Sequence, residues 1–125
     1  MVRAENALMR ILYVEDNVVV RELTHELLSQ DQRHVVAMAT AEQALREFKQ
    51  QPFDVVITDV SLPAMSGLEL IQNILDLKPQ TPIIVASGYD LDLNLKRWGP
   101  NVRGIVKPFE PDEIDALITE LCAAI

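Results

Sequence analysis

Residues Asp54–Gly67 read DVVITDVSLPAMSG, and their pattern is the strongest indication of the fold class. Its first part, Asp54–Thr58, contains three consecutive apolar β-branched residues. A short continuous apolar run is typical of a strand that is covered on both faces, as in a parallel sheet. We expect a loop at Asp59–Met65, and Ser66 with Glu69 has the form of a capping box, which predicts the start of a helix. The stretch therefore predicts a buried parallel strand, an acidic loop and a helix.

The same alternation of strand and helix extends in both directions from this stretch. Further strands are predicted at residues 10–14, 34–39, 83–86 and 104–106, and further helices after residue 17, after Thr40 (with Gln43 as a second capping box) and over Pro111–Ala123. Val20, Leu23 and Leu27 share one face of the first helix. Asp90–Trp98 fits a strand or a helix, and we interpret it as a short or irregular helix. Such alternation predicts an α/β, doubly wound (βα)5 domain with a five-stranded parallel sheet.

The composition indicates one ordinary globular domain. A chain of 125 residues with 49% hydrophobic and 24% charged residues can bury a core without disulfides. The net charge of −8 argues against direct binding of nucleic acid. A single cysteine, Cys122, fits a reducing cytoplasm, and no apolar run approaches the roughly 20 residues of a membrane span. We expect residues 1–9 to be an N-terminal tail without a signal peptide and residues 10–125 to form a cytoplasmic domain that binds no membrane.

Polar side chains stand where the predicted strands end. Glu15 and Asp16 follow the first strand, Asp59 the third, Ser87 the fourth and Lys107 the fifth. Ligands of parallel α/β sheets bind beyond these carboxyl ends. Three adjacent carboxylates repel one another unless a cation joins them, and a hard divalent ion, Mg²⁺ first, suits oxygen ligands. With an ammonium and a hydroxyl added, the set can stabilise a phosphoryl group while a carboxylate attacks it.

Each of these residues alone also has an ordinary structural explanation. Asp16 or Asn17 can cap the following helix, Asp59 can form a turn, and Lys107 can be a solvated lysine. It is the joint placement of all of them at strand ends that favours a functional site.

Four short motifs resemble those of the receiver domains of two-component response regulators. The motifs are Ile11–Asn17 (ILYVEDN), Asp54–Gly67 with its proline four and its glycine eight residues after Asp59, Val85–Gly88 (VASG) and Val106–Phe109 (VKPF). Each motif alone is weak, but the four in this order, from about residue 10 to the end of the chain, are specific. The resemblance implies a flavodoxin-like strand order of 2-1-3-4-5.

The resemblance also implies a metal site. Asp16 and Asp59 would bind Mg²⁺ directly, Glu15 would act mostly through water, and the backbone carbonyl of Ser61 would be the remaining protein ligand. Mn²⁺ would be a substitute metal.

A phosphoryl group is the second element of the implied site. Asp59 would accept it from a phosphohistidine of a histidine kinase or a histidine phosphotransfer protein. Ser87 would move toward the acyl phosphate, and Lys107 would pair with it, next to a Lys107–Pro108 bond that is often cis in the family. Tyr89 would influence how long the phosphoryl group lasts. Such a domain signals by changing shape to regulate a partner or an attached output; it is not an enzyme beyond its own phosphorylation and dephosphorylation.

The sequence departs from the family at Gly104, where many receivers carry Tyr or Phe three residues before the lysine. The segment between Ser87 and Lys107 is also short. We therefore expect a non-standard output face on the fourth helix, fifth strand and last helix. A degenerate receiver, a binding module that takes no phosphate, is the alternative function.

Two other α/β classes fit the sequence less well. A haloacid-dehalogenase-type phosphatase needs a second acid where Ser61 stands, and a flavodoxin-type FMN binder needs a phosphate-cradling loop where Glu15–Asn17 would repel phosphate. No output domain follows the last predicted helix, so a stand-alone regulator and a domain of a larger protein both remain open, as does a homodimer through the last helices.

Overall fold

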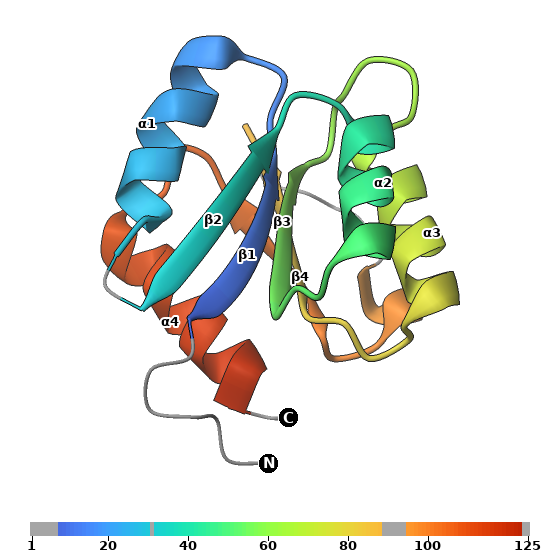
Figure 1. Cartoon of the computed structure of the whole chain (residues 1–125). Coiled ribbons are helices and arrows are strands. Elements are labelled where there is room, and N and C mark those ends of the chain that lie inside the picture. The colour runs from blue at the N-terminus through green and yellow to red at the C-terminus, as the bar shows by residue number, and fades with distance from the viewer. Residues whose placement is uncertain (1–7, 31, 89–94, 124–125) are drawn as a thin grey trace.

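The structure is a computed structural model and describes residues 8–30, 32–88 and 95–123. In this part of the chain, five strands alternate with helices (Figure 1). The strands are β1 (Met9–Val14), β2 (Arg33–Met38), β3 (Val55–Asp59), β4 (Ile83–Ser87) and β5 (Val102–Val106). The helices are α1 (Val18–Leu28), α2 (Ala41–Gln50), α3 (Gly67–Leu77) and α4 (Pro111–Ala123), with a 3-10 helix, η1 (Leu95–Trp98), before β5.

The strands form one parallel sheet with the order β2-β1-β3-β4-β5. The predicted fold class and strand order are therefore confirmed. The order reverses between β1 and β3, which are direct neighbours, and this places the carboxyl ends of the two strands that precede the acidic residues side by side.

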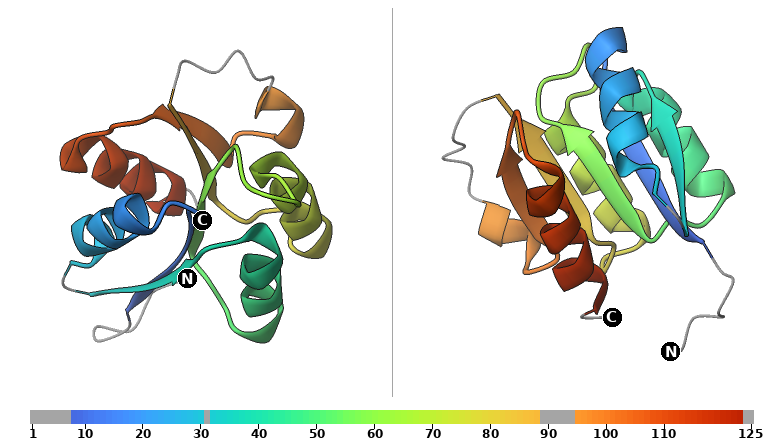
Figure 2. Two further views of the ribbon diagram at one scale, coloured as in Figure 1. Left: turned by 90° about the horizontal axis from the view of Figure 1, so that it is seen from above. Right: turned by 90° about the vertical axis from the view of Figure 1, so that its left-hand side faces the viewer.

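Helices cover both faces of the sheet, α1 and α4 on one face and α2 and α3 on the other (Figures 1 and 2). Alternate residues of β3 enter the two hydrophobic cores. Val56 packs in the core under α2 and α3, whereas Val55 and Ile57 pack in the core under α1 and α4. All three side chains are fully buried, which explains why this strand is a continuous apolar run.

Side-chain caps start three of the helices. Asn17, Thr40 and Ser66 each accept a hydrogen bond from the backbone N–H three residues later, at 3.0–3.1 Å. The helix starts predicted from Thr40 and Ser66 are thus confirmed. Because Asn17 caps α1, Asp16 is not needed for this structural role.

Several strand boundaries differ from the predicted ones. β3 extends to Asp59 and β4 to Ser87, so both residues end a strand instead of following it. β5 begins at Val102, two residues before the predicted start. Backbone pairing with β4 already begins there, since the carbonyl of Asn101 accepts a hydrogen bond from the backbone N–H of Ile83, and such pairing does not depend on side-chain polarity.

The ambiguous segment before β5 contains a short 3-10 helix, Leu95–Trp98, and its residues 90–94 lie outside the described part. Among the described residues, no helix is long and apolar enough to cross a membrane.

Candidate functional site

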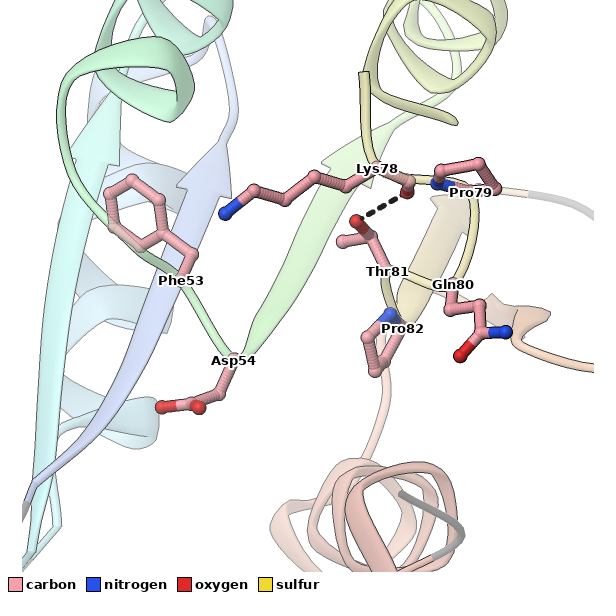
Figure 3. Close-up of a pocket in the computed structure, with 7 residues that line it drawn as sticks. All are labelled: Phe53, Asp54, Lys78, Pro79, Gln80, Thr81 and Pro82. Atoms are coloured by element: carbon pink, nitrogen blue, oxygen red, sulfur yellow. Dashed lines mark hydrogen bonds between the residues drawn. The ribbon is translucent and has the colours of Figure 1, made fainter. Parts of the chain in front are cut away.

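The amino end of the sheet carries a pocket of about 440 Å³ (Figure 3). Phe53, Asp54 and residues 78–82 line it. Asp54 is the one carboxylate among these lining residues, and it accepts a hydrogen bond from the backbone N–H of Arg10 at 2.7 Å. This pocket gathers no set of acidic groups, so the carboxyl end of the sheet is the better candidate.

Three carboxylates meet at the carboxyl end. Glu15 and Asp16 follow β1, and Asp59 ends the neighbouring β3. One oxygen from each lies within 4.8 Å of the others. Glu15 and Asp59 are buried, with exposed fractions of 2% and 9%, whereas Asp16 is exposed. Buried carboxylates at this separation need positive charge nearby to remain ionised together.

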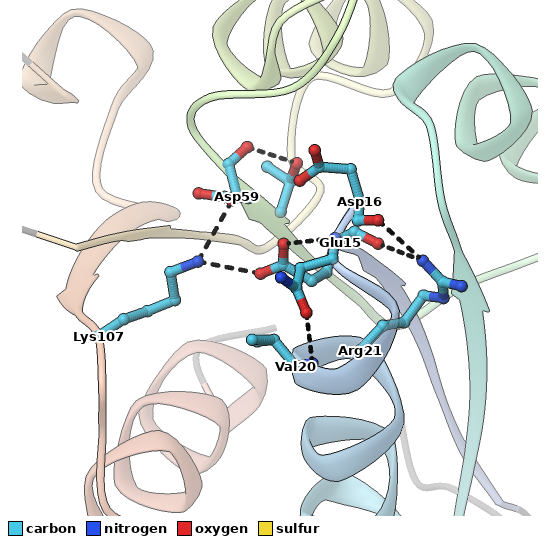
Figure 4. Close-up of polar contacts among 8 residues, drawn as sticks. Glu15, Asp16, Val20, Arg21, Asp59 and Lys107 are labelled. Carbon is cyan, nitrogen blue, oxygen red and sulfur yellow. Dashed lines mark hydrogen bonds and ion pairs between the residues drawn. The ribbon is translucent and has the colours of Figure 1, made fainter.

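Lys107 supplies one such charge from the residue that follows β5. Its Nζ lies 2.9 Å from Oε1 of Glu15 and 3.2 Å from Oδ2 of Asp59 (Figure 4). Burial alone would lower the pKa of Lys107, but its hydrogen bond with Glu15 and the charges of Asp59 and Glu15 outweigh burial and raise that pKa above its ordinary value. Lys107 is therefore charged at neutral pH, and the formal charges of the three carboxylates and the one ammonium sum to −2.

This donor set fits a hard divalent cation. Carboxylates and backbone carbonyls are the ligands that Mg²⁺ takes in proteins, and such an ion would neutralise the charge excess. Ser61, whose carbonyl is the predicted fourth protein ligand, lies two residues beyond the end of β3 in an exposed loop.

Ser87 stands at the same edge of the sheet. It is the last residue of β4, is buried, and lies one position beyond Ala86, the partner of Asp59 in the β3–β4 pairing. Its carbonyl accepts a hydrogen bond from the backbone N–H of Lys107, which connects the two strand ends. The structure thus brings the predicted residues to one edge. Tyr89 lies outside the described residues.

Gly67 allows the acidic strand end and α3 to meet closely. A Cβ at this position would lie 2.0 Å from the carbonyl oxygen of Asp59 and 3.0 Å from Cα of Val60. Because both contacts are with backbone, a side chain here would displace Asp59. Steric exclusion therefore explains why a glycine, Gly67, stands eight residues after Asp59, which the spacing of the motif alone did not explain.

The Lys107–Pro108 bond is cis, as the resemblance implied.

Residues 107–109 and α1 form a groove of about 410 Å³ beside the site. It is lined by Val20, Leu23, Thr24, Leu27, Lys107, Pro108 and Phe109. The three aliphatic residues share one face of α1, as predicted, but this face borders the groove, and Leu23 is 63% exposed.

Gly104 has no side chain to fill its surroundings, and Leu95 of η1 packs there instead. A Cβ on Gly104 would lie 3.2 Å from Cδ1 of Leu95. Trp98 holds the other end of η1 on α3, because its Nε1 donates a hydrogen bond to Oε1 of Gln72 at 3.0 Å. The expectation of a non-standard output face remains a prediction.

Sequence reasoning missed Arg21, which contacts the acidic loop from α1. Its Nη1 donates to the carbonyl oxygen of Glu15 at 2.9 Å, with a weaker contact of 3.4 Å to the carbonyl of Asp16. The available signal was a basic residue five positions after Asp16, where the first turns of a helix bring a long side chain back toward the loop.

Comparison with known proteins identifies the family. The response regulator receiver domain family matches residues 11–119. The two-component response regulator PhoP of Pseudomonas aeruginosa is 31% identical over 122 residues, which are 90% of this chain and 51% of that protein. The chain spans about half or less of the length of the curated relatives that it matches.

Solved structures agree with this result. The response regulator TrrA from Thermotoga maritima, in complex with Mg²⁺-BeF, is 31% identical, with a TM-score of 0.82 and coverage of 91% of this chain and 99% of that one. The receiver domain of sensor histidine kinase PA1611 from Pseudomonas aeruginosa, with a magnesium ion in its active-site cleft, is 25% identical, with a TM-score of 0.83 and coverage of 94% and 99%. The resemblance noted from four motifs is thereby confirmed, and the chain belongs to the response regulator receiver domain family of two-component signalling.

Proposed function

We propose that Asp59 accepts a phosphoryl group from a phosphohistidine of a histidine kinase or histidine phosphotransfer protein, with Mg²⁺ as the cofactor. The observation that carries this proposal is the meeting of Glu15, Asp16 and Asp59 within 4.8 Å, with Lys107 bound to two of them. The domain acts as a signalling receiver, and its only chemistry is the phosphorylation of Asp59 and the later hydrolysis of the acyl phosphate.

Asp16 and Asp59 would hold the metal directly, Glu15 through water, and Ser61 through its backbone carbonyl. When bound, Mg²⁺ supplies charge neutralisation for the oxygens of the phosphoryl group. Two proteins similar to this chain support magnesium as the metal: the PA1611 receiver has a magnesium ion coordinated in its active-site cleft, and TrrA is in complex with Mg²⁺-BeF. The exposed position of Asp16 leaves one side of the cluster open to solvent, from which an ion can enter.

Asp59 acts as the nucleophile. One carboxylate oxygen attacks phosphorus in line with the P–N bond of the phosphohistidine; the new O–P bond forms as the P–N bond breaks, and the imidazole nitrogen keeps the electron pair and takes up a proton. Lys107, already 3.2 Å from Asp59, pairs with a phosphoryl oxygen, and the hydroxyl of Ser87 donates to another.

The phosphodonor would dock on the groove between α1 and the loop after β5. This groove borders Lys107 and is largely apolar, through Val20, Leu23, Leu27 and Phe109. An exposed apolar patch beside a reacting group suits a protein donor, because a small phosphate ester would gain nothing from it. The partner would thus contact Leu23 and bring its phosphohistidine to Asp59.

Phosphorylation would shift the conformation of the domain and so regulate a partner or an attached output, in a cytoplasmic setting that the lone Cys122 suits. The complete set of Glu15, Asp16, Asp59, Ser87 and Lys107 favours this function over that of a degenerate receiver. Gly104 indicates that the signal is read without the aromatic residue of many receivers.

The test is intact-mass measurement after incubation with Mg²⁺ and phosphoramidate or acetyl phosphate. We expect one added phosphoryl group, lost when EDTA replaces Mg²⁺ and absent from Asp59→Asn. If neither donor nor a purified cognate kinase modifies a protein that still binds Mg²⁺, the degenerate receiver is the correct function.

A further inference from the structure

We infer that Arg21 is a positioning residue for the metal site: it holds the backbone of Glu15 and Asp16 so that both carboxylates are aimed at one point before the ion arrives. This inference rests on the proposed function, because it assumes that Mg²⁺ binds at the acidic cluster.

The contacts of Arg21 are with backbone, not with carboxylates. Its Nη1 lies 2.9 Å from the carbonyl oxygen of Glu15 and 3.4 Å from the carbonyl oxygen of Asp16 (Figure 4). A single guanidinium nitrogen thus spans two consecutive carbonyl groups. Their orientation sets the direction of the peptide between the two acidic residues, and through it the directions of both side chains.

Figure 4 shows Arg21 on the opposite side of the loop from Lys107 and Asp59. The two carbonyl groups turn toward Arg21, while the carboxylates face Asp59 and Lys107. Asn17 supports the same arrangement, since its backbone N–H donates to Oε2 of Glu15 at 3.1 Å and its side chain caps α1. The acidic loop is therefore held by two residues at the start of α1.

The charge of Arg21 is not used in an ion pair within the described part of the chain, whereas Arg33 pairs with Asp115 and Arg103 pairs with Glu120. Arg21 therefore orders the acidic loop without occupying any carboxylate oxygen that a metal would need. Residues outside the ligand shell that orient ligands in this way typically change metal affinity by 10- to 100-fold when they are removed.

Lysine cannot fully replace arginine in this role. The planar guanidinium is pre-organised and presents several N–H donors, whereas an ammonium on a flexible stem makes the same contacts with greater loss of side-chain freedom. Lysine at this position would keep the positive charge but hold the two carbonyl groups less firmly. An intermediate loss of Mg²⁺ affinity in Arg21→Lys would therefore show that the geometry of the contact matters, and not the charge alone.

The test is titration calorimetry of Mg²⁺ binding to the unphosphorylated full chain and to three variants. We expect Arg21→Gln to weaken Mg²⁺ binding by about tenfold or more and Arg21→Lys to give an intermediate dissociation constant. Arg103→Gln, which removes an exposed ion pair between β5 and α4, is the matched control and should leave the dissociation constant unchanged.

A second measurement separates positioning from loss of folding. The Mg²⁺ concentration that gives half the maximal rate of phosphorylation by phosphoramidate should rise by the same factor in Arg21→Gln, while the rate at saturating Mg²⁺ stays as in the wild type. A merely structural role would lower the thermal midpoint and the saturating rate without this shift.

The outcomes distinguish the inference from the proposed function. Unchanged Mg²⁺ affinity in both Arg21 variants, with a phosphorylated wild type, overturns the inference alone. Weakened affinity in a protein that no donor phosphorylates supports the inference and overturns the proposed function. A wild-type chain with no measurable Mg²⁺ affinity overturns both.

Discussion

Lys107 would have two opposite effects on the site: it would weaken metal binding, and it would speed phosphoryl transfer to Asp59. Its ammonium binds Glu15 and Asp59, so it competes with a metal for their oxygens. We expect Lys107→Met to tighten Mg²⁺ binding by roughly three- to tenfold, because the competing charge is lost. Phosphorylation at saturating Mg²⁺ should slow by roughly 10- to 100-fold, because a cation next to the phosphoryl oxygens is lost. Calorimetry and rate measurements check the two effects, and weaker Mg²⁺ binding in the variant would contradict this role.

Tyr13 gives a prediction about pH. Burial of its phenol, opposed in part by a hydrogen bond with Thr24, raises its pKa from 10.0 to about 12. The folded protein thus keeps a proton that the unfolded chain releases, so the contribution to stability is complete below pH 10 and is lost as the pH rises toward 12. The unfolding free energy of the wild type should fall more steeply there than that of Tyr13→Phe, by up to about 1.4 kcal/mol per pH unit.

Urea unfolding at pH 9.5 and 11.5 checks this difference. Lys107, whose pKa is also raised, is present in both proteins, so its effect cancels in the comparison. Parallel curves for wild type and Tyr13→Phe would show that the phenol does not titrate in this window.

Two glycines where elements of the fold meet differ in what an added Cβ atom would contact: backbone at Gly67 and a side chain at Gly104. A Cβ at Gly67 would strike the carbonyl of Asp59 at the end of β3, whereas a Cβ at Gly104 would press only on the end of the Leu95 side chain. We expect Gly67→Ala to cost more than about 3 kcal/mol of unfolding free energy and Gly104→Ala less than about 1 kcal/mol. Urea unfolding measures both, and equal losses would contradict this assignment.

The elements themselves were largely predictable from sequence. Apolar runs and capping residues fix them locally, as with Val55–Ile57 in β3 and the caps Thr40 and Ser66. Their exact ends were less predictable, because β5 begins where backbone pairing begins and not where apolar residues do. The position of Leu95 on Gly104 depends on how η1 folds back on β5, and no local pattern encodes that.

At the scale of the whole molecule, the site exists because the sheet order reverses. Glu15, Asp59 and Lys107 are far apart in sequence and meet only because β1 and β3 are neighbours and β5 ends at the same edge. The site residues could be predicted because strand ends of a parallel sheet share one edge. Arg21 was missed because its contacts are with backbone carbonyls, which form no charge pattern in the sequence; only its spacing from Asp16 pointed to the acidic loop.

Coupling of the metal to folding follows from this arrangement. An ion that joins the ends of β1 and β3 in the folded chain and does not bind the unfolded chain stabilises the fold, by about 2.7 kcal/mol at a free concentration of 100 times its dissociation constant. We expect the thermal midpoint to be on the order of 10 °C higher in Mg²⁺ than in EDTA. Asp16→Asn should largely remove the increase, and an equal midpoint in Mg²⁺ and EDTA for the wild type would exclude a metal site of this kind.

The proposed function requires that Asp59 carries the phosphoryl group. The most direct measurement is reduction of the phosphorylated protein with sodium borohydride, which converts an acyl phosphate into an alcohol, followed by peptide mass spectrometry. We predict homoserine at position 59 alone, and only after incubation with donor and Mg²⁺. Reduction at position 15 or 16, or no reduced residue in a protein that has gained the mass of a phosphoryl group, would show that Asp59 is not the phosphoacceptor.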